Sequence, residues 1–309
     1  TPIKSSAASD VYKRQFLEGY NRATYNRRLS IALLRGMNKS MMHTYENNIP
    51  QAWDDIRNHE ALFESFASMY LREHPGDMLR LKREHTYKVL AHARAIVAQE
   101  GLASQEGRAT LLAALYHDTG RFPQYVRWRT FSDAESENHG YLGVHVVKKE
   151  HFLTGEPPNI HKWVLTAIAL HNRYALPALP EPYLTITHAV RDADKLDIMR
   201  IMAQHLSRPI PTRDVVLRVQ DAPKLWSQSI VDTVLSGGIP SYHDLRYVND
   251  FRILLGSWIQ DLHFTSSKKT CVASGFLQEV LKGLPSTPEL QPVTAYLLNE
   301  FSTVRNLCG

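Results

Sequence analysis

The stretch LLAALYHDTG, residues 111–120, runs from an apolar segment into a histidine and an aspartate, His117 and Asp118. Its apolar residues favour a helix rather than a strand. Neighbouring residues on a helix point about 100° apart, so both side chains can reach one object only if it lies over the helix end. Gly120 then stands where a helix end favours a left-handed cap. The stretch therefore predicts a helix whose end presents an imidazole and a carboxylate to a shared ligand, for which a metal ion is suited.

The same helical spacing extends along most of the chain. Apolar residues recur three and four positions apart, and alternating Val, Ile and Thr runs of strand length are almost absent. Gly101 is a second candidate for a left-handed cap, and Pro158 marks a helix start. In the central section we expect helices near residues 61–72, 79–99, 106–118, 137–152, 158–173 and 183–205. The sequence predicts an all-α fold.

The composition is that of a globular protein with a core of normal size. The chain has 309 residues, of which 43% are hydrophobic and 22% charged. Its two cysteines, Cys271 and Cys308, are far apart and outside any C-x-x-C spacing, so neither a disulfide framework nor a cysteine zinc site is indicated. No apolar run approaches the roughly 18 residues that a membrane span needs. We expect a cytoplasmic protein that does not cross a membrane.

The first residues are set apart from the rest. Ser5–Gln15, SSAASDVYKRQ, resembles the translation of a transposase sequencing adapter, so residues 1–15 are interpreted as an artefact. Leaving out Lys4, Lys13 and Arg14 together with Asp10 lowers the net charge from +5 to +3. So small an excess makes nucleic acid an unexpected partner. We divide the remainder into a helical preface (16–60), a core (61–206) and a C-terminal helical extension packed on the core (207–309).

Two other predicted helices carry side chains that could meet His117 and Asp118. In RLKREHTYKVLAHARAIV, residues 80–97, His85 lies on the apolar face and is expected to point toward the packed side. In AVRDADKLDIMR, residues 189–200, Asp192 and Asp194 diverge by about 200°, so at most one of them faces the site. Imidazole and carboxylate groups from separate helices form a ligand set that suits divalent transition metals.

In this order, His85, the His117 and Asp118 pair, and Asp194 resemble the H…HD…D signature of the HD-domain superfamily of metal-dependent phosphohydrolases. The segment ADKLDIMR, residues 193–200, is similar to the ADRL-type ending of stringent-response hydrolases in that superfamily, which selects Asp194 over its neighbours. The resemblance covers about residues 79–206. It implies an HD-type helical bundle with helical additions at both ends.

The resemblance also implies a second set of metal ligands. His139 and His171 lie between the HD pair and Asp194, where binuclear members of the superfamily place further ligands. It therefore implies one or two divalent ions, chosen from Mn, Fe, Ni, Mg and Zn. The chain lacks the GYP element of the HD-GYP branch and has Asn172 directly after His171, so a cyclic dinucleotide substrate is not assigned.

The activity implied by the resemblance is hydrolysis of a phosphoester, in a nucleotide or another phosphomonoester or phosphodiester, by a metal-activated hydroxide. Asp118 and Arg121 are the expected catalytic residues. Phosphate also requires positive charge beside the metal, and arginine suits its oxygens. The expected substrate-binding residues are Arg121, Arg127, Arg129 and Lys195. The basic stretch Arg80–Arg83 is interpreted as the solvated start of its helix.

Two alternatives stay open at this point. One is a helical binding module that senses a nucleotide without turnover. The other is a di-iron oxygenase of the HD type. The expected partner is a phosphorylated small molecule or a nucleotide, and the sequence does not determine the oligomeric state.

Overall fold

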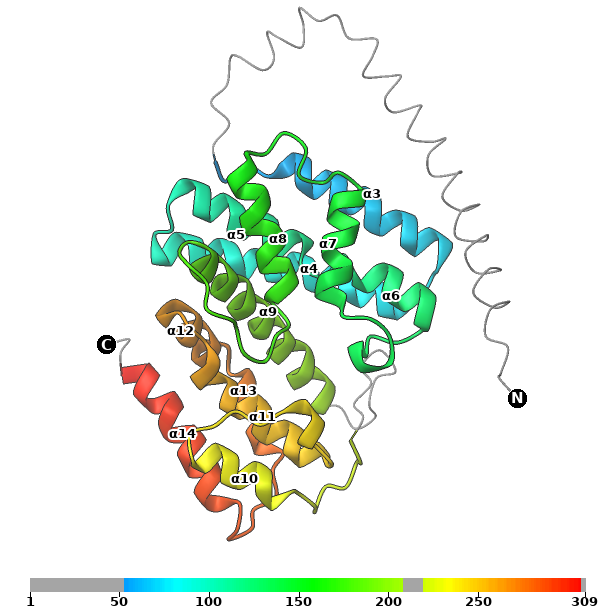
Figure 1. Cartoon of the computed structure of the whole chain (residues 1–309). Helices are drawn as coiled ribbons and strands as arrows, with labels where there is room; N and C mark the ends of the chain where they lie inside the picture. The colour runs from blue at the N-terminus through cyan, green and yellow to red at the C-terminus, as the bar shows by residue number, and fades with distance from the viewer. Residues whose placement is uncertain (1–52, 208–218, 307–309) are drawn as a thin grey trace, which may run out of the picture. The chain divides into compact units, whose positions relative to one another are not determined.

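The computed structural model describes residues 53–207 and 219–306, which belong to one compact unit (Figure 1). The expected artefact, most of the preface and residues 208–218 of the extension lie outside the described residues. The all-α prediction is confirmed, since the described residues contain no strand beyond an isolated bridge between Gln220 and Tyr247. The first group of helices is α3 (Arg57–Glu73), α4 (Asp77–Glu100), α5 (Ser104–Tyr116), α6 (Arg121–Trp128), α7 (His139–Lys149), α8 (Pro158–Leu170) and α9 (Tyr183–Leu206), with a short 3₁₀ turn η1 (Asp133–Glu135). The second is α10 (Gln228–Leu235), η2 (Tyr242–Asp244), α11 (Val248–Asp261), α12 (Thr265–Ser274), α13 (Phe276–Lys282) and α14 (Gln291–Asn306).

The six central helices expected from the sequence are all present. They differ from expectation mainly at their ends, where α5 stops at Tyr116 and α8 at Leu170. His117 and His171 therefore each occupy the first position after a helix. Residues 121–128, which lie outside the expected helices, form the amphipathic helix α6, which buries Phe122 and Gln124.

Two glycines stand where the backbone requires the absence of a side chain. Gly101 caps α4 with φ of 64°, which confirms the left-handed cap. The same expectation is wrong for Gly120, whose φ is −64°. Gly120 serves close packing instead, because a Cβ there would lie 2.3 Å from the His139 carbonyl oxygen and 2.6 Å from the Gly143 nitrogen. The glycine thus allows the start of α6 to approach α7.

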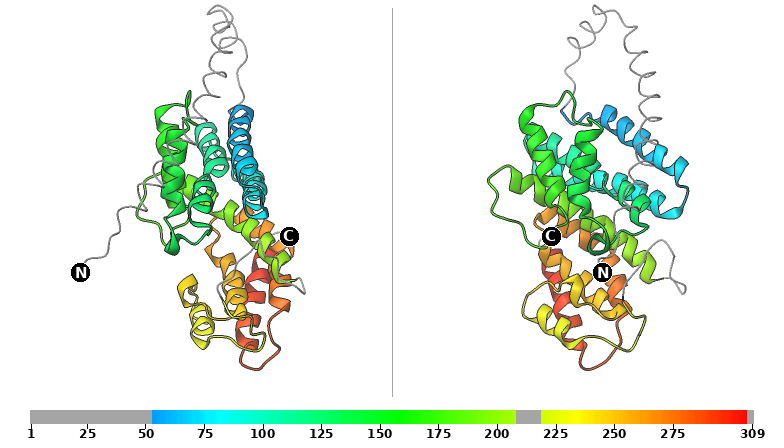
Figure 2. Two further views of the ribbon diagram at one scale, coloured as in Figure 1. Left: turned by 90° about the vertical axis from the view of Figure 1, so that its right-hand side faces the viewer. Right: turned by 45° about the vertical axis from the view of Figure 1, so that its right-hand side comes forward.

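Two hydrophobic cores share helix α9. The first joins α9 to α3, α4, α5, α7 and α8, with Phe63, Leu112 and Ile168 among its buried residues. The second begins at Leu196 and joins the later turns of α9 to α10, α11, α13 and α14. Figures 1 and 2 show α10–α14 gathered along one part of α9. Helix α9 therefore carries side chains that face both cores.

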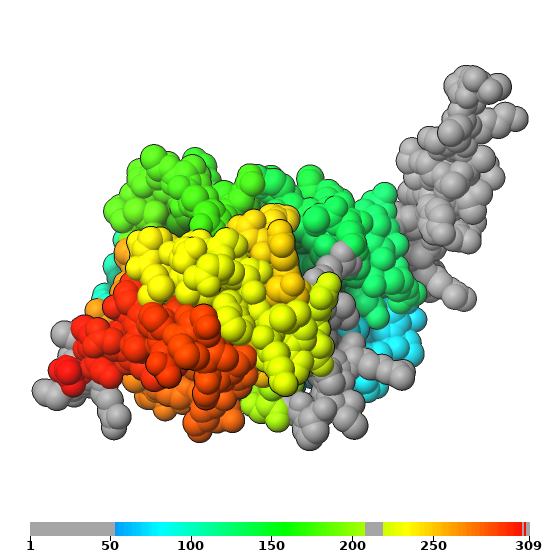
Figure 3. Space-filling view, turned by 90° about the horizontal axis from the view of Figure 1, so that it is seen from below, coloured from blue at the N-terminus to red at the C-terminus, as the bar shows by residue number. Residues whose placement is uncertain are grey.

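The C-terminal helices pack on α9 through α12 and α13. Seen from below, α10, in yellow, and α14, in red, lie next to each other on the surface (Figure 3), whereas most residues of α11 are buried. None of the described helices combines the length and apolar character required to cross a membrane.

Candidate metal centre

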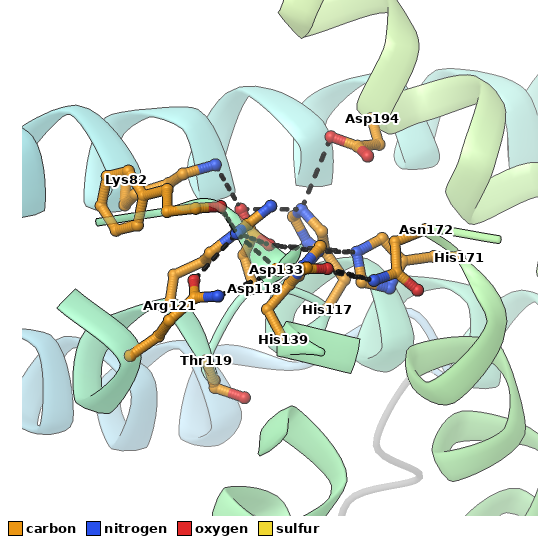
Figure 4. A network of polar contacts seen from close by, with 12 residues as sticks. Lys82, His117, Asp118, Thr119, Arg121, Asp133, His139, His171, Asn172 and Asp194 are labelled. Carbon is orange, nitrogen blue, oxygen red and sulfur yellow. Dashed lines mark hydrogen bonds and ion pairs between the residues drawn. The ribbon is translucent and has the colours of Figure 1, made fainter. Parts of the chain in front are cut away.

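The structure brings all six expected ligand residues together (Figure 4). They come from α4, the ends of α5 and α8, the start of α7, and α9. Their ligand atoms form three overlapping groups, each within 4.8 Å: His85 with His117 and Asp118; His117 with His171 and Asp194; and Asp118 with His139 and His171. All are buried except Asp194, which is intermediate.

His117 and His171 are fixed in the same way by the helix ends they follow. The last carbonyl groups of a helix have no partner within the helix. His117 Nδ1 lies 2.8 Å from the Ala114 carbonyl oxygen, and His171 Nδ1 lies 2.8 Å from that of Ile168. A carbonyl oxygen only accepts, so each Nδ1 carries the hydrogen and each Nε2 presents a lone pair to the cluster.

His85 and His139 are fixed by carboxylates instead. His85 Nδ1 lies 2.7 Å from Asp197 Oδ2, and His139 Nδ1 lies 2.7 and 2.8 Å from the two oxygens of Asp133. An ionised carboxylate also only accepts, so these two rings have the same tautomer as the others. Metal-binding histidines characteristically donate their second ring nitrogen to a carboxylate or a backbone carbonyl.

The centre of the cluster therefore holds acceptors that face acceptors. His139 Nε2 and His171 Nε2 are 3.1 Å apart, and His85 Nε2 is 3.0 Å from Asp194 Oδ1. Within the described part of the chain, the buried Nε2 atoms of His85 and His117 have no hydrogen-bond partner. Such a set of lone pairs and carboxylates is unfavourable when buried unless a cation lies among them. The residues fit divalent metal ions.

Asp118 lies between the two histidine pairs. Its Oδ2 is 3.6 Å from His85 Nε2 and 3.7 Å from His117 Nε2. Its Oδ1 is 3.5 Å from His139 Nε2 and 3.9 Å from His171 Nε2. One carboxylate thus offers an oxygen to each pair. Thr119 points away from the cluster in Figure 4, and its hydroxyl donates to the Tyr116 carbonyl at 2.8 Å.

The electrostatics of the site favour the metal-binding forms of His117, His139, His171 and Asp118. For His85, burial lowers the pKa, but contacts with Asp194 and Asp197 outweigh it and raise the pKa. Burial lowers the pKa of His117, and it lowers the pKa of His139 and of His171 to about 4. Burial opposes the charge on Asp118, yet the charges of Lys82, His117, Arg121 and His139 together outweigh it and hold the Asp118 pKa well below its ordinary value. Neutral imidazole and ionised carboxylate are the forms that bind metals.

Lys82 is a site residue that the sequence interpretation missed. Its Nζ donates to Asp118 Oδ2 at 2.7 Å, and its side chain is only 17% exposed. Taking Arg80–Arg83 as a solvated helix start is therefore wrong for Lys82. The available signal was its position three residues before His85, which places both side chains on one helix face.

Arg121 lies beside the cluster, with its Nε 3.4 Å from Asp118 Oδ1. Its Nη1 donates to Gln124, Asp133 and the Phe131 carbonyl. These contacts fix the guanidinium between α6 and η1. The Nε atom is buried and makes no hydrogen bond to the described residues.

The other three expected substrate-binding residues are not brought to the cluster. Arg127 and Arg129 are exposed and lie over the rings of Trp128 and Tyr125. Six residues turn α6 by about 240°, so Arg127 cannot share the direction of Arg121. The Lys195 ammonium pairs with Asp261 on α11. Among the described residues, no hydrogen bond or ion pair links these three side chains to the six ligand residues.

Comparisons with known proteins agree with the geometry. The HD domain family model matches residues 83–199, which run from α4 to α9 and contain all six ligand residues. Searches of curated proteins and of solved structures gave no match. Residues 83–199 therefore resemble an HD domain, and they contain His and Asp groups able to hold metal.

Proposed function

We propose that the protein is a metal-dependent phosphohydrolase whose site holds two divalent cations. The observation that carries the proposal is the set of four imidazole Nε2 atoms and two carboxylates that converge while every Nδ1 is held by a protein acceptor. The HD domain match supports the same reaction class.

In this proposal Asp118 is shared by the two ions. His85, His117 and Asp194 complete one ligand group, and His139 and His171 complete the other. Nitrogen and oxygen donors of this kind suit Mn, Fe, Ni, Mg or Zn ions. When bound, such ions lower the pKa of a coordinated water toward neutrality and polarise a phosphoryl oxygen.

The residues around Asp118 recognise the phosphoester. Lys82 Nζ has three N–H donors, one of which is used by Asp118, and the Arg121 Nε–H is without a hydrogen-bond acceptor in the described structure. The side chains of Lys82 and Arg121 therefore orient the phosphoryl oxygens and balance their negative charge. The water oxygen forms a bond to phosphorus, the bond from phosphorus to the leaving oxygen breaks, and the leaving oxygen takes up a proton. The expected substrate is a phosphorylated small molecule or a nucleotide.

The test combines metal content with product release. The full chain is loaded with Mn²⁺ or Fe²⁺, dialysed, and assayed for metal by elemental analysis and for release of nitrophenol from nitrophenyl phosphate mono- and diesters and of phosphate from nucleotides. We expect Asp118→Ala to lose metal and activity together, while the exposed Arg127→Ala serves as a matched control that keeps both. An Asp118→Ala protein with full metal content and full product release would overturn the proposal.

The same preparation separates the two alternatives. Tight nucleotide binding without product under any of the metals would indicate a binding module. Oxygen consumption by the iron-loaded protein, again without phosphate release, would indicate an oxygenase.

A further inference from the structure

The geometry points to Asp261, in the C-terminal helices, as a positioning residue for the ligand His171. The inference rests on the proposed metal function. Asp261 does not contact the cluster itself but acts through Arg191 on α9, whose guanidinium holds the end of α8. The C-terminal helices would in this way influence one of the two ligand groups.

Arg191 caps the end of α8, just where His171 is placed. Its Nη1 donates to the His171 carbonyl at 3.0 Å and also to the Arg173 carbonyl, and Arg191 is only 7% exposed. A cation at this position satisfies carbonyl groups that have no helical partner and complements the negative end of the helix dipole. Because the His171 ring is held by the Ile168 carbonyl of the same turn, its orientation depends on this turn staying intact.

The Arg191 guanidinium lies near a second cation, Lys195, and near one carboxylate, Asp261. Lys195 follows Arg191 by four residues on α9, so the two side chains share a face and their like charges repel. The Lys195 side chain is only 12% exposed, and burial lowers its pKa. Asp261 accepts a hydrogen bond from Lys195 Nζ, and its Oδ2 lies 3.9 Å from Arg191 Nη2. One carboxylate therefore contacts both cations and reduces the repulsion between them.

The position of Asp261 in its own helix supports this role. It is the last residue of α11, where a carboxylate is disfavoured by the helix dipole. The backbone N–H groups of His263 and Phe264, which follow it, donate to Asp192 of α9 at 2.9 to 3.0 Å. Helix α9 therefore contacts this region twice. Its Asp192 accepts from the link after α11, and its Lys195 and Arg191 face Asp261, so Asp261 is held against these two side chains.

Neutralising Asp261 should therefore affect one ligand group more than the other. We expect Lys195 and Arg191 to repel each other, which weakens the contact of Arg191 with the His171 and Arg173 carbonyls and displaces His171. His85 and His117 are anchored by Asp197 and by the Ala114 carbonyl, which this chain of contacts does not include.

The experiment is a titration of the metal-free full chain with Co²⁺, followed by absorbance and checked by elemental analysis. The wild type is expected to bind two ions. For Asp261→Asn we expect the affinity for one ion to fall about tenfold and that for the other to stay unchanged, in line with the effect of residues behind metal ligands. Glu279→Gln, which breaks an exposed ion pair with Lys282, is the matched control and should leave both affinities unchanged.

A second variant keeps the test decisive if Asp261→Asn destabilises the protein. Adding Lys195→Met to Asp261→Asn removes the repulsion, so the double variant should recover most of the lost affinity. Unchanged affinities in Asp261→Asn, or no recovery in the folded double variant, would overturn the role of Asp261. A wild type that binds fewer than two ions would instead overturn the two-ion function, before any variant is compared.

Discussion

Replacing Asp197 with Asn should selectively weaken the binding of one of the two proposed metal ions. Asp197 is fully buried on α9, and its Oδ2 accepts the Nδ1–H of His85 at 2.7 Å. Arg200 donates to both of its oxygens, at 2.6 and 3.2 Å. Asparagine keeps the shape and one acceptor oxygen but removes the charge that orients the His85 ring and makes its Nε2 more basic.

The magnitude follows from the type of hydrogen bond that is changed. A hydrogen bond to a charged group contributes about 1.5 to 3 kcal/mol and a neutral one about 0.5 to 1.5 kcal/mol. The substitution therefore costs about 1 to 2 kcal/mol in holding His85. Because 1.4 kcal/mol corresponds to a tenfold change in affinity, the ion bound by His85 should bind about 5- to 30-fold more weakly.

The assay is a Co²⁺ titration of the full chain, with Asp133→Asn as the matched control. Asp133 holds His139 as Asp197 holds His85, so replacing Asp133 should weaken the binding of the other ion. Circular dichroism confirms that each variant is folded. The assignment of each carboxylate to its own ligand group would be refuted if both variants weakened the binding of the same ion. It would also be refuted if both changed the Co²⁺ affinities less than twofold.

Three further predictions concern other parts of the structure. Lys82→Met should keep the metal content while lowering product release about a hundredfold, because it removes a cation aimed at the reacting charge; an equal loss of metal would show that it acts only by holding the ligands. Although burial opposes the charge of Glu156, the hydrogen bonds and charges of Arg108 and His59 together outweigh it and lower the Glu156 pKa from 4.5 to about 2. Ionised Glu156 should thus contribute about 3 kcal/mol to stability at pH 7 and roughly half as much at pH 3, and the contribution is lost as the pH falls through 2. Urea unfolding of Glu156→Gln and of the wild type at both pH values measures this contribution, and a contribution that did not change with pH would contradict the prediction. Gly120→Ala should destabilise the fold by about 1 to 3 kcal/mol, since the methyl group meets the His139 carbonyl, and an unchanged urea midpoint would disprove that close approach.

Local patterns were sufficient for the helices, whereas the choice of ligand residues rested on the resemblance to the HD-domain signature. Helical spacing depends on neighbours three and four positions apart, which the sequence displays directly. The divergence of Asp192 and Asp194 is likewise a property of one helix. In the structure Asp194 joins the cluster, whereas Asp192 accepts from the backbone of His263 and Phe264.

The anchors of the ligands could not be identified in the same way. Asp197 lies 112 residues from His85, and nothing local to Asp133 indicates that it would face His139. For Asp197 a partial signal existed, because it follows Asp194 by three residues and so shares its helix face.

The sequence by itself determined the all-α class and the positions of the central helices, because both are a matter of residue type and short-range spacing. The ordered set of His and Asp residues came from the resemblance to the HD-domain signature. Only the tertiary structure decided where the positively charged side chains lie. It turned Lys82 toward Asp118, left Arg127 and Arg129 exposed, and paired Lys195 with Asp261. A charged side chain settles where burial and a counter-ion from a distant segment balance its desolvation, and that partner is set by the packing of helices rather than by neighbours in the chain.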